Sequence, residues 1–89
     1  MSNKIDGGSA IINTLKNLGV KDIFTLAGGH INPMYNACRE MGVRLIDTHH
    51  EQGASMAADA YGRVTKSPGV CLVTAGPGLT NTMTGMAGA

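Results

Sequence analysis

The chain has 89 residues, a hydrophobic content of 43% and a formal net charge of +1, which together fit one small domain or part of one. Its lysines and arginines are scattered among aspartates and glutamates, so it lacks the basic stripe that neutralises nucleic-acid phosphates. No apolar run approaches the ~20 residues needed to span a bilayer, and the first residues lack the apolar core of a signal peptide. We therefore expect a cytoplasmic protein that binds neither nucleic acid nor membrane.

A first helix is predicted between Ser9, a good N-cap, and Gly19, which suits a left-handed residue at a helix end, because apolar residues recur between them at helical spacing. Residues 22–26 then form a short apolar run that ends at Ala27-Gly28-Gly29. This pattern is typical of a buried strand that enters a tight loop.

The pair Asn32-Pro33 predicts the start of a second helix, because asparagine caps free N–H groups and proline lacks the one that would be orphaned. That helix should end near residue 41, with Gly42 closing it. Residues 43–47 predict a second strand. A helix rich in alanine follows from Glu51 to Val64, and its small side chains give a flat face that lets another backbone pack closely.

Ser67-Pro68-Gly69 predicts a turn, residues 70–75 the third strand, and Gly76-Pro77-Gly78 leads into a last helical stretch from Leu79. The predicted order is αβαβαβα. Apolar strands separated by helices indicate an α/β fold with an open parallel sheet flanked by helices. Because both edges of such a short sheet stay open, we expect residues 1–89 to be the N-terminal part of a larger domain.

Ligands of open parallel sheets bind outside the carboxyl ends of the strands, which directs attention to the loops at 27–32, 48–52 and 76–81. These loops contain His30, Glu51 and Asn81 and could line one pocket. Glu51 has a second explanation, since Thr48-x-x-Glu51 has the spacing of a capping box. Gly76-Pro77-Gly78 is weak as a phosphate cradle because the lysine of a P-loop is missing, and a plain turn also explains it.

Metal binding is not predicted. The stretch His50-Glu51-Gln52-Gly53-Ala54 lacks the second histidine of a helical zinc pair. Cys38 and Cys71 lie far apart in apolar segments, which excludes a metal knuckle and makes a disulfide unexpected in the cytoplasm. Both thiols should be small buried side chains.

Whole segments around these loops are more specific than the single motifs. They are His50-Glu51-Gln52-Gly53-Ala54 continued by Met56-Ala57-Ala58-Asp59-Ala60-Tyr61-Gly62-Arg63, then Thr74-Ala75-Gly76-Pro77-Gly78-Leu79-Thr80-Asn81, and Phe24-Thr25-Leu26-Ala27-Gly28-Gly29-His30-Ile31. Together they resemble the N-terminal pyrimidine-binding domain of thiamine-diphosphate-dependent enzymes of the acetolactate synthase kind. The resemblance covers nearly the whole chain from about Ser9.

This resemblance implies a thiamine diphosphate cofactor. In the family, the glutamate that matches Glu51 touches N1′ of the aminopyrimidine and promotes the imino tautomer, whose nitrogen removes the C2 proton of the thiazolium. Pro77 and Asn81 should lie at or near the pyrimidine, and Gly28 and Gly29 should let the backbone approach it. A tight turn and a helix start are the alternative explanation for these four residues.

The resemblance leaves the reaction open. Many acetolactate synthases have proline where Ala27 stands and a small residue where His30 stands, so this sequence looks closer to benzaldehyde lyase and to 2-hydroxyacyl-CoA lyases. The expected reaction is either decarboxylation and carboligation of 2-keto acids or cleavage of 2-hydroxy ketones or 2-hydroxyacyl-CoA. His30 is a candidate acid/base, because histidine titrates near neutrality, and a surface imidazole is the alternative.

The family's Mg²⁺ and diphosphate motif, a Gly-Asp-Gly followed by an asparagine, belongs to a separate later domain and has no match in this sequence. The resemblance also allows FAD as a cofactor. It implies a parent enzyme that is a homodimer or homotetramer, with the isolated chain inactive. A non-catalytic, flavodoxin-like binding module, with no chemistry at Glu51, is the alternative from another class.

Overall fold

A computed structural model describes residues 7–28 and 31–89 of the chain. Its elements follow one another in the order α1 (Gly7–Asn17), β1 (Asp22–Thr25), α2 (Asn32–Met41), β2 (Arg44–Asp47), α3 (Glu51–Thr65), β3 (Val70–Leu72), α4 (Pro77–Thr80) and α5 (Met83–Gly88). None of these helices is long and apolar enough to cross a bilayer.

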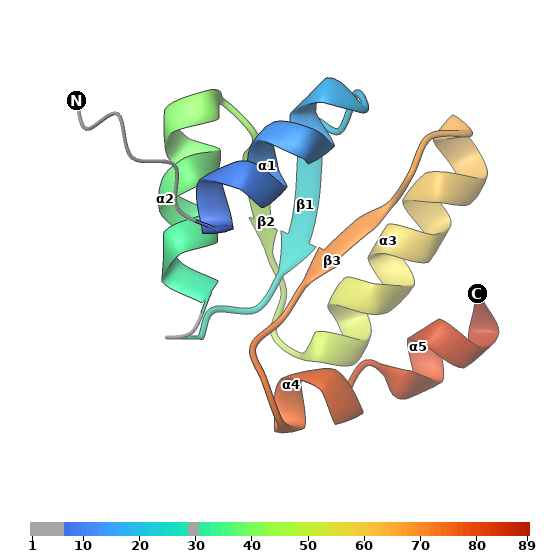
Figure 1. Cartoon of the computed structure of the whole chain (residues 1–89). Helices are drawn as coiled ribbons and strands as arrows, with labels where there is room; N and C mark the ends of the chain where they lie inside the picture. Colours follow the sequence, from blue (N-terminus) through green and yellow to red (C-terminus); the bar gives the residue numbers. More distant parts are fainter. Residues whose placement is uncertain (1–6, 29–30) are drawn as a thin grey trace.

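The strands form a parallel sheet in the order β2-β1-β3, in which Ile23 of β1 pairs with Leu45 of β2 and Val70 of β3. Across the sheet, the chain steps from β1 to β2 in one direction and then returns past β1 to β3 in the opposite direction. Right-handed crossovers then place α2 and α3 on opposite faces. Figure 1 shows this arrangement, with α1 beside α2 on one side and α3 on the other. The predicted open parallel sheet flanked by helices is confirmed.

The main core lies between the sheet and the pair α1 and α2. It consists of buried apolar side chains from both helices, β1 and the turns beside the strands, namely Ile12, Val20, Ile23, Ala37, Cys38 and Val43. Both cysteines are free thiols, as expected. Cys38 is fully buried, and desolvation raises the pKa of its thiol. Cys71 is only partly buried, so the prediction that both thiols are buried is wrong for Cys71.

The opposite face is covered by α3, which approaches the sheet through small residues. Ala54 and Ala58 are buried at 0% and 6% exposure, as the predicted alanine face requires. The chain segment that leads into β3 passes so close that a Cβ on Gly69 would overlap the carbonyl oxygen of Ala58. This contact explains why glycine stands at position 69.

A buried hydroxyl joins β1 to β3 and α2. Thr25 is 0% exposed, and its Oγ1 donates to the carbonyl of Leu72 at 2.7 Å. The hydroxyl of Tyr35 lies 2.6 Å from the same oxygen. Because threonine has a single hydroxyl proton, Tyr35 must be the donor in that second bond.

This network predicts unequal costs for two substitutions. Thr25→Val should lower the free energy of unfolding by about 2 kcal/mol, because it leaves the Leu72 carbonyl without its partner, and Tyr35→Phe by about 1 kcal/mol, because Thr25 keeps its bond to Leu72. Denaturant unfolding of the two variants measures both costs. Equal losses would contradict the network.

Some element boundaries differ from the predicted ones. α1 begins at Gly7 instead of after Ser9, and a Cβ on Gly8 would lie 2.8 Å from the backbone carbon of Pro33, so this first turn packs directly on α2. β3 ends at Leu72 and not at residue 75. Leu72 pairs with Thr25, the last residue of β1, so the residues after Leu72 have no strand beside them to pair with.

The last helical stretch also differs. It is split into α4 and α5, and the N–H of Thr82 donates to the Leu79 carbonyl in a tight turn between them.

Candidate functional site

The predicted loops meet at the carboxyl ends of the strands. In the lower part of Figure 1, the ends of β1 and β2, the first turn of α3 and the short α4 gather at this end of the sheet. The chain leaves β1 towards α2 on one face and leaves β3 towards α5, which packs on α3, on the other. In open α/β sheets, the crevice that binds ligands lies at a reversal of this kind, outside the carboxyl ends of the strands.

Helix α3 begins with a cap that differs from the predicted one. His50 is the N-cap residue, in an extended conformation, and its Nδ1 accepts the N–H of Gln52 at 3.0 Å. Glu51 is therefore the first residue of the helix, and the position that a capping box would need is occupied by Gly53, which has no side chain. The proposed Thr48-x-x-Glu51 capping box is wrong.

The carboxylate of Glu51 points instead to the residue that follows α4. The side-chain amide of Asn81 donates from Nδ2 to Oε1 of Glu51 at 3.2 Å. Both residues are partly exposed. The pKa of the Cys71 thiol is raised, first by burial and then by the negative charge of Glu51, so this carboxylate also lies near β3.

α4 places Asn81 through its own short turn. Gly76 precedes the helix with φ of 71°, a left-handed conformation that favours glycine, and Pro77 is its first residue. The N–H of Asn81 then donates to the Pro77 carbonyl at 2.9 Å. Pro77 is exposed at this end of the molecule, and its contact with a cofactor stays a prediction.

The loops after β1 and β3 touch each other at Gly28. A Cβ at this position would lie 2.5 Å from Cβ of Thr74, so only glycine lets the loops approach this closely. This packing accounts for Gly28 without a ligand, and its predicted role beside a cofactor stays a prediction. Gly29 and His30, the other candidates on this loop, lie outside the described residues.

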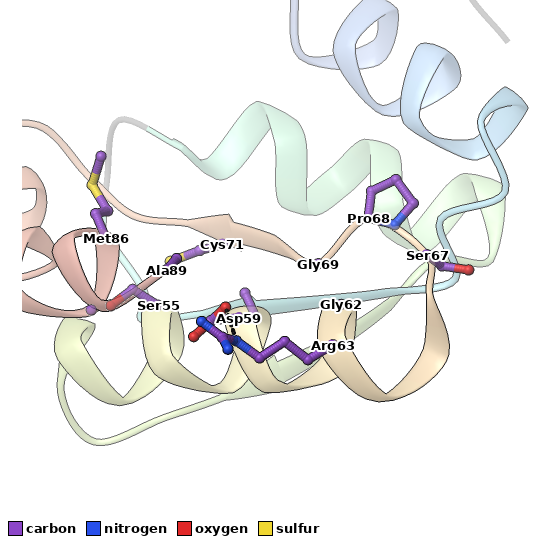
Figure 2. Close-up of a pocket in the computed structure, with 12 residues that line it drawn as sticks. Ser55, Asp59, Gly62, Arg63, Ser67, Pro68, Gly69, Cys71, Met86 and Ala89 are labelled. Carbon is purple, nitrogen blue, oxygen red and sulfur yellow. Dashed lines mark hydrogen bonds and ion pairs between the residues drawn. The ribbon is translucent and has the colours of Figure 1, made fainter.

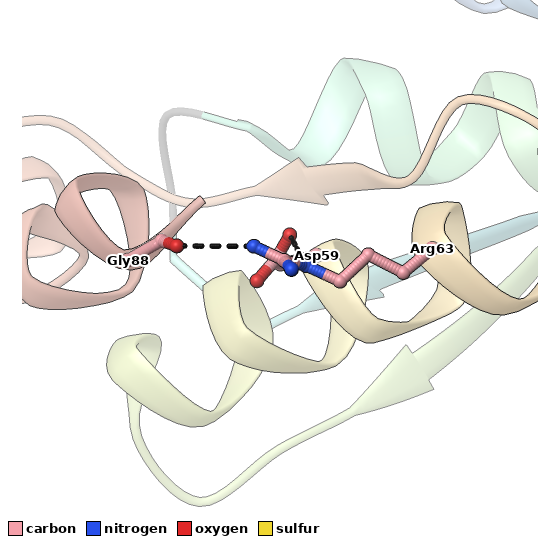
Figure 3. A network of polar contacts seen from close by, with 3 residues as sticks. All are labelled: Asp59, Arg63 and Gly88. Atoms are coloured by element: carbon pink, nitrogen blue, oxygen red, sulfur yellow. Dashed lines mark hydrogen bonds and ion pairs between the residues drawn. The ribbon is translucent and has the colours of Figure 1, made fainter.

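A cleft of about 460 Å³ lies elsewhere, between α3, β3 and α5. Figure 2 shows Ser55, Cys71 and Met86 around it, and Figure 3 shows Arg63 of α3 bound both to Asp59 and to the carbonyl of Gly88. The bond to Gly88 ties α5 to α3. The cleft is lined by neither Glu51 nor Asn81, so it is separate from the gathered site residues.

The site thus presents a carboxylate with one oxygen held by an amide and with access to solvent. Such a group can share a proton with a ring nitrogen of a ligand that enters the crevice. Sequence reasoning located Glu51 and Asn81 but missed His50 as the cap. The sequence does indicate this cap, because the histidine directly before Glu51 carries a ring nitrogen that can accept a helix N–H. In the described part of the chain, no group of three or more histidine, cysteine or acidic residues is arranged to hold a metal ion.

Comparison with known proteins gives a consistent picture. Residues 5–89 match the family described as the N-terminal TPP binding domain of thiamine pyrophosphate enzymes. The chain is 52% identical over 82 residues to the acetolactate synthase large subunit of Mycobacterium tuberculosis, which covers 92% of this chain and 15% of that protein.

It is also 53% identical over 78 residues to 2-hydroxyacyl-CoA lyase 2 from both Danio rerio and Homo sapiens, with 88% of this chain covered in each case. The chain spans 12% to 15% of the length of these relatives.

Proposed function

The chain belongs to the family of N-terminal TPP-binding domains of thiamine pyrophosphate enzymes, and on that premise we propose that residues 1–89 form the N-terminal part of the pyrimidine-binding domain of a larger enzyme of this family. We propose Glu51 as the residue that contacts the pyrimidine. The observation that carries this proposal is the bond from Asn81 to Glu51 at the carboxyl ends of the strands. The family match argues against the flavodoxin-like alternative.

The residues present fit the pyrimidine half of thiamine diphosphate, the same compound as thiamine pyrophosphate. Asn81 binds Oε1 of Glu51, so Oε2 is the oxygen that is available to a ligand. Gly28 lets the β1 loop lie close to the β3 loop at this end of the sheet. Pro77 and Gly29 would add backbone and ring surface around the ligand.

When bound, thiamine diphosphate supplies an acidic thiazolium carbon and accepts the electron pair left by a broken carbon–carbon bond. Glu51 would share a proton between its free oxygen and the pyrimidine nitrogen. Asn81 fixes the other oxygen and so sets the direction in which that proton is offered. A glutamine at position 51 would keep the shape of the side chain but would have no acidic proton to transfer.

For the whole protein we propose decarboxylation and carboligation of 2-keto acids, which the mycobacterial relative named acetolactate synthase supports. A second candidate is cleavage of a 2-hydroxyacyl-CoA or a 2-hydroxy ketone. It is supported by the lyase relatives. The lyase from Danio rerio is 53% identical to this chain and the synthase is 52% identical, so the two identities are nearly the same. His30 would act as acid or base towards the substrate in either reaction.

We also propose, from the family resemblance alone, that Mg²⁺ and the diphosphate group are bound by a later domain. The enzyme would be a cytoplasmic homodimer or homotetramer. FAD is a further candidate cofactor. Mass spectrometry of the purified full-length protein under native conditions reports its subunit number and any flavin.

The two reactions are separated by their products. The full-length protein, loaded with thiamine diphosphate and Mg²⁺, is given pyruvate in one reaction and a 2-hydroxyacyl-CoA in another. Carbon dioxide and acetolactate identify the synthase, whereas an aldehyde and formyl-CoA identify the lyase. If the cofactor is bound and neither pair of products forms, the acetolactate synthase and the 2-hydroxyacyl-CoA lyase are both contradicted.

Asn81→Ala is expected to slow exchange of the C2 proton of bound thiamine diphosphate by about tenfold. The reason is that a hydrogen bond to a charged group contributes about 1.5 kcal/mol and its loss leaves Glu51 free to rotate. Proton NMR of the cofactor in deuterated solvent measures the exchange rate. Thr84→Ala, at an exposed position of α5, is the control and should exchange at the wild-type rate. An unchanged rate in Asn81→Ala would remove Asn81 from the site.

A further inference from the structure

We propose that His50 is a positioning residue, whose ring holds the first turn of α3 so that Glu51 faces the crevice. The proposal rests on the proposed function of Glu51. It assigns to His50 no contact with cofactor or substrate. The effect of His50 passes through the backbone of the residue beside it.

The imidazole ring of His50 holds the first turn of α3 through one hydrogen bond. Nδ1 of His50 accepts the N–H of Gln52 at 3.0 Å, and this N–H would otherwise be one of the orphan donors at a helix start. The two bonded groups flank Glu51 in the sequence. The hydrogen bond between His50 and Gln52 therefore closes a short loop of atoms that includes the backbone of Glu51.

The backbone of His50 is held as well. Its carbonyl accepts the Thr48 hydroxyl at 2.9 Å and the N–H of Ala54 at 3.3 Å. The Thr48 hydroxyl also lies 3.2 Å from the Thr25 carbonyl at the end of β1. The cap is therefore anchored to the sheet, and the orientation of Glu51 relative to the crevice follows from it.

The bond requires a neutral imidazole, because Nδ1 can accept an N–H only when it carries no proton. The tautomer must then have its proton on Nε2. A carboxamide can replace this acceptor, since asparagine is among the best N-cap residues and alanine among the poorest. That difference separates a capping role from a direct chemical role of the imidazole.

The test uses the full-length protein with His50→Ala, His50→Asn and Lys66→Val. Lys66 is the exposed residue that ends α3, with φ of 61°, so a β-branched residue there strains the same helix at its far end. Hydrogen–deuterium exchange of the segment 50–56 in the protein without cofactor reports the cap directly. Exchange of the C2 proton of bound thiamine diphosphate, at saturating cofactor, reports the orientation of Glu51.

We expect His50→Ala to speed amide exchange in segment 50–56 and to slow C2 exchange, each by about fivefold, which is the loss of one N-cap. His50→Asn should restore both rates, and Lys66→Val should change neither.

Equal loss of C2 exchange in His50→Ala and His50→Asn would overturn the proposal in favour of direct imidazole chemistry. Wild-type rates in His50→Ala would also overturn it. If C2 exchange is absent from the wild type, the function proposed for Glu51 fails, and amide exchange still tests the cap.

Discussion

Glu51→Gln in the full-length protein is expected to slow C2 proton exchange of bound thiamine diphosphate by about 10²- to 10⁴-fold, the usual contribution of a positioned acid or base. Glutamine preserves the length of the side chain and can still meet Asn81. It cannot supply the proton that the pyrimidine nitrogen needs. Rapid-quench NMR of the cofactor in deuterated solvent measures the rate, and calorimetric titration with thiamine diphosphate shows that the cofactor still binds.

Glu40→Gln is the matched control, because Glu40 is an exposed carboxylate on α2, an element that covers the face of the sheet opposite to α3. It should exchange at the wild-type rate. Exchange in Glu51→Gln within twofold of the wild type, with the cofactor bound, would defeat the assignment of Glu51.

The fold was predictable where local signals decide the structure. α2 runs from Asn32 to Met41 as expected, because Pro33 favours its first turn and Gly42 ends it with φ of 76°. The predicted cap by Asn32 is wrong, since Ile31 is the N-cap residue and no side chain caps the helix. Strand boundaries were less predictable, because a strand ends where its partner ends. β3 illustrates this: its apolar run continues beyond Leu72, and only the pairing with Thr25 fixes its end.

Of the candidate site residues, the structure brings Glu51 and Asn81 together, as their place in the sequence indicated. Loops at the carboxyl ends of parallel strands must lie near one another, and this topology predicts that Glu51 and Asn81 are neighbours. The cap of α3 does not follow from this topology. Thr48 is the better capping residue by type, but its hydroxyl is bonded to the carbonyls of Thr25 and His50, and the Thr25 contact joins residues distant in the sequence.

A second large effect is expected at Gly69, where the prediction concerns stability and not catalysis. Gly69→Ala should lower the free energy of unfolding by about 3 kcal/mol, at the upper end of the usual cost of overpacking, because the added methyl group meets a backbone carbonyl. The Ala58 oxygen belongs to the middle of α3 and cannot rotate away as a side chain could. Figure 2 shows Gly69 on the segment that enters β3 above this helix.

Thermal unfolding of the full-length protein measures the effect, which should be a fall in the Tm of the transition in which this domain unfolds. Gly53→Ala is the control in α3 itself, since its Cβ would lie 3.8 Å from Thr48, an ordinary contact, and alanine favours helix. Its Tm should stay at or above that of the wild type.

Because the segment beyond Gly69 carries β3 and the loop to α4, a displaced Gly69 would also move Asn81 away from Glu51. Gly69→Ala should therefore slow exchange of the C2 proton as well as lower the stability. A wild-type Tm in Gly69→Ala would show that the segment does not approach α3 as closely as described.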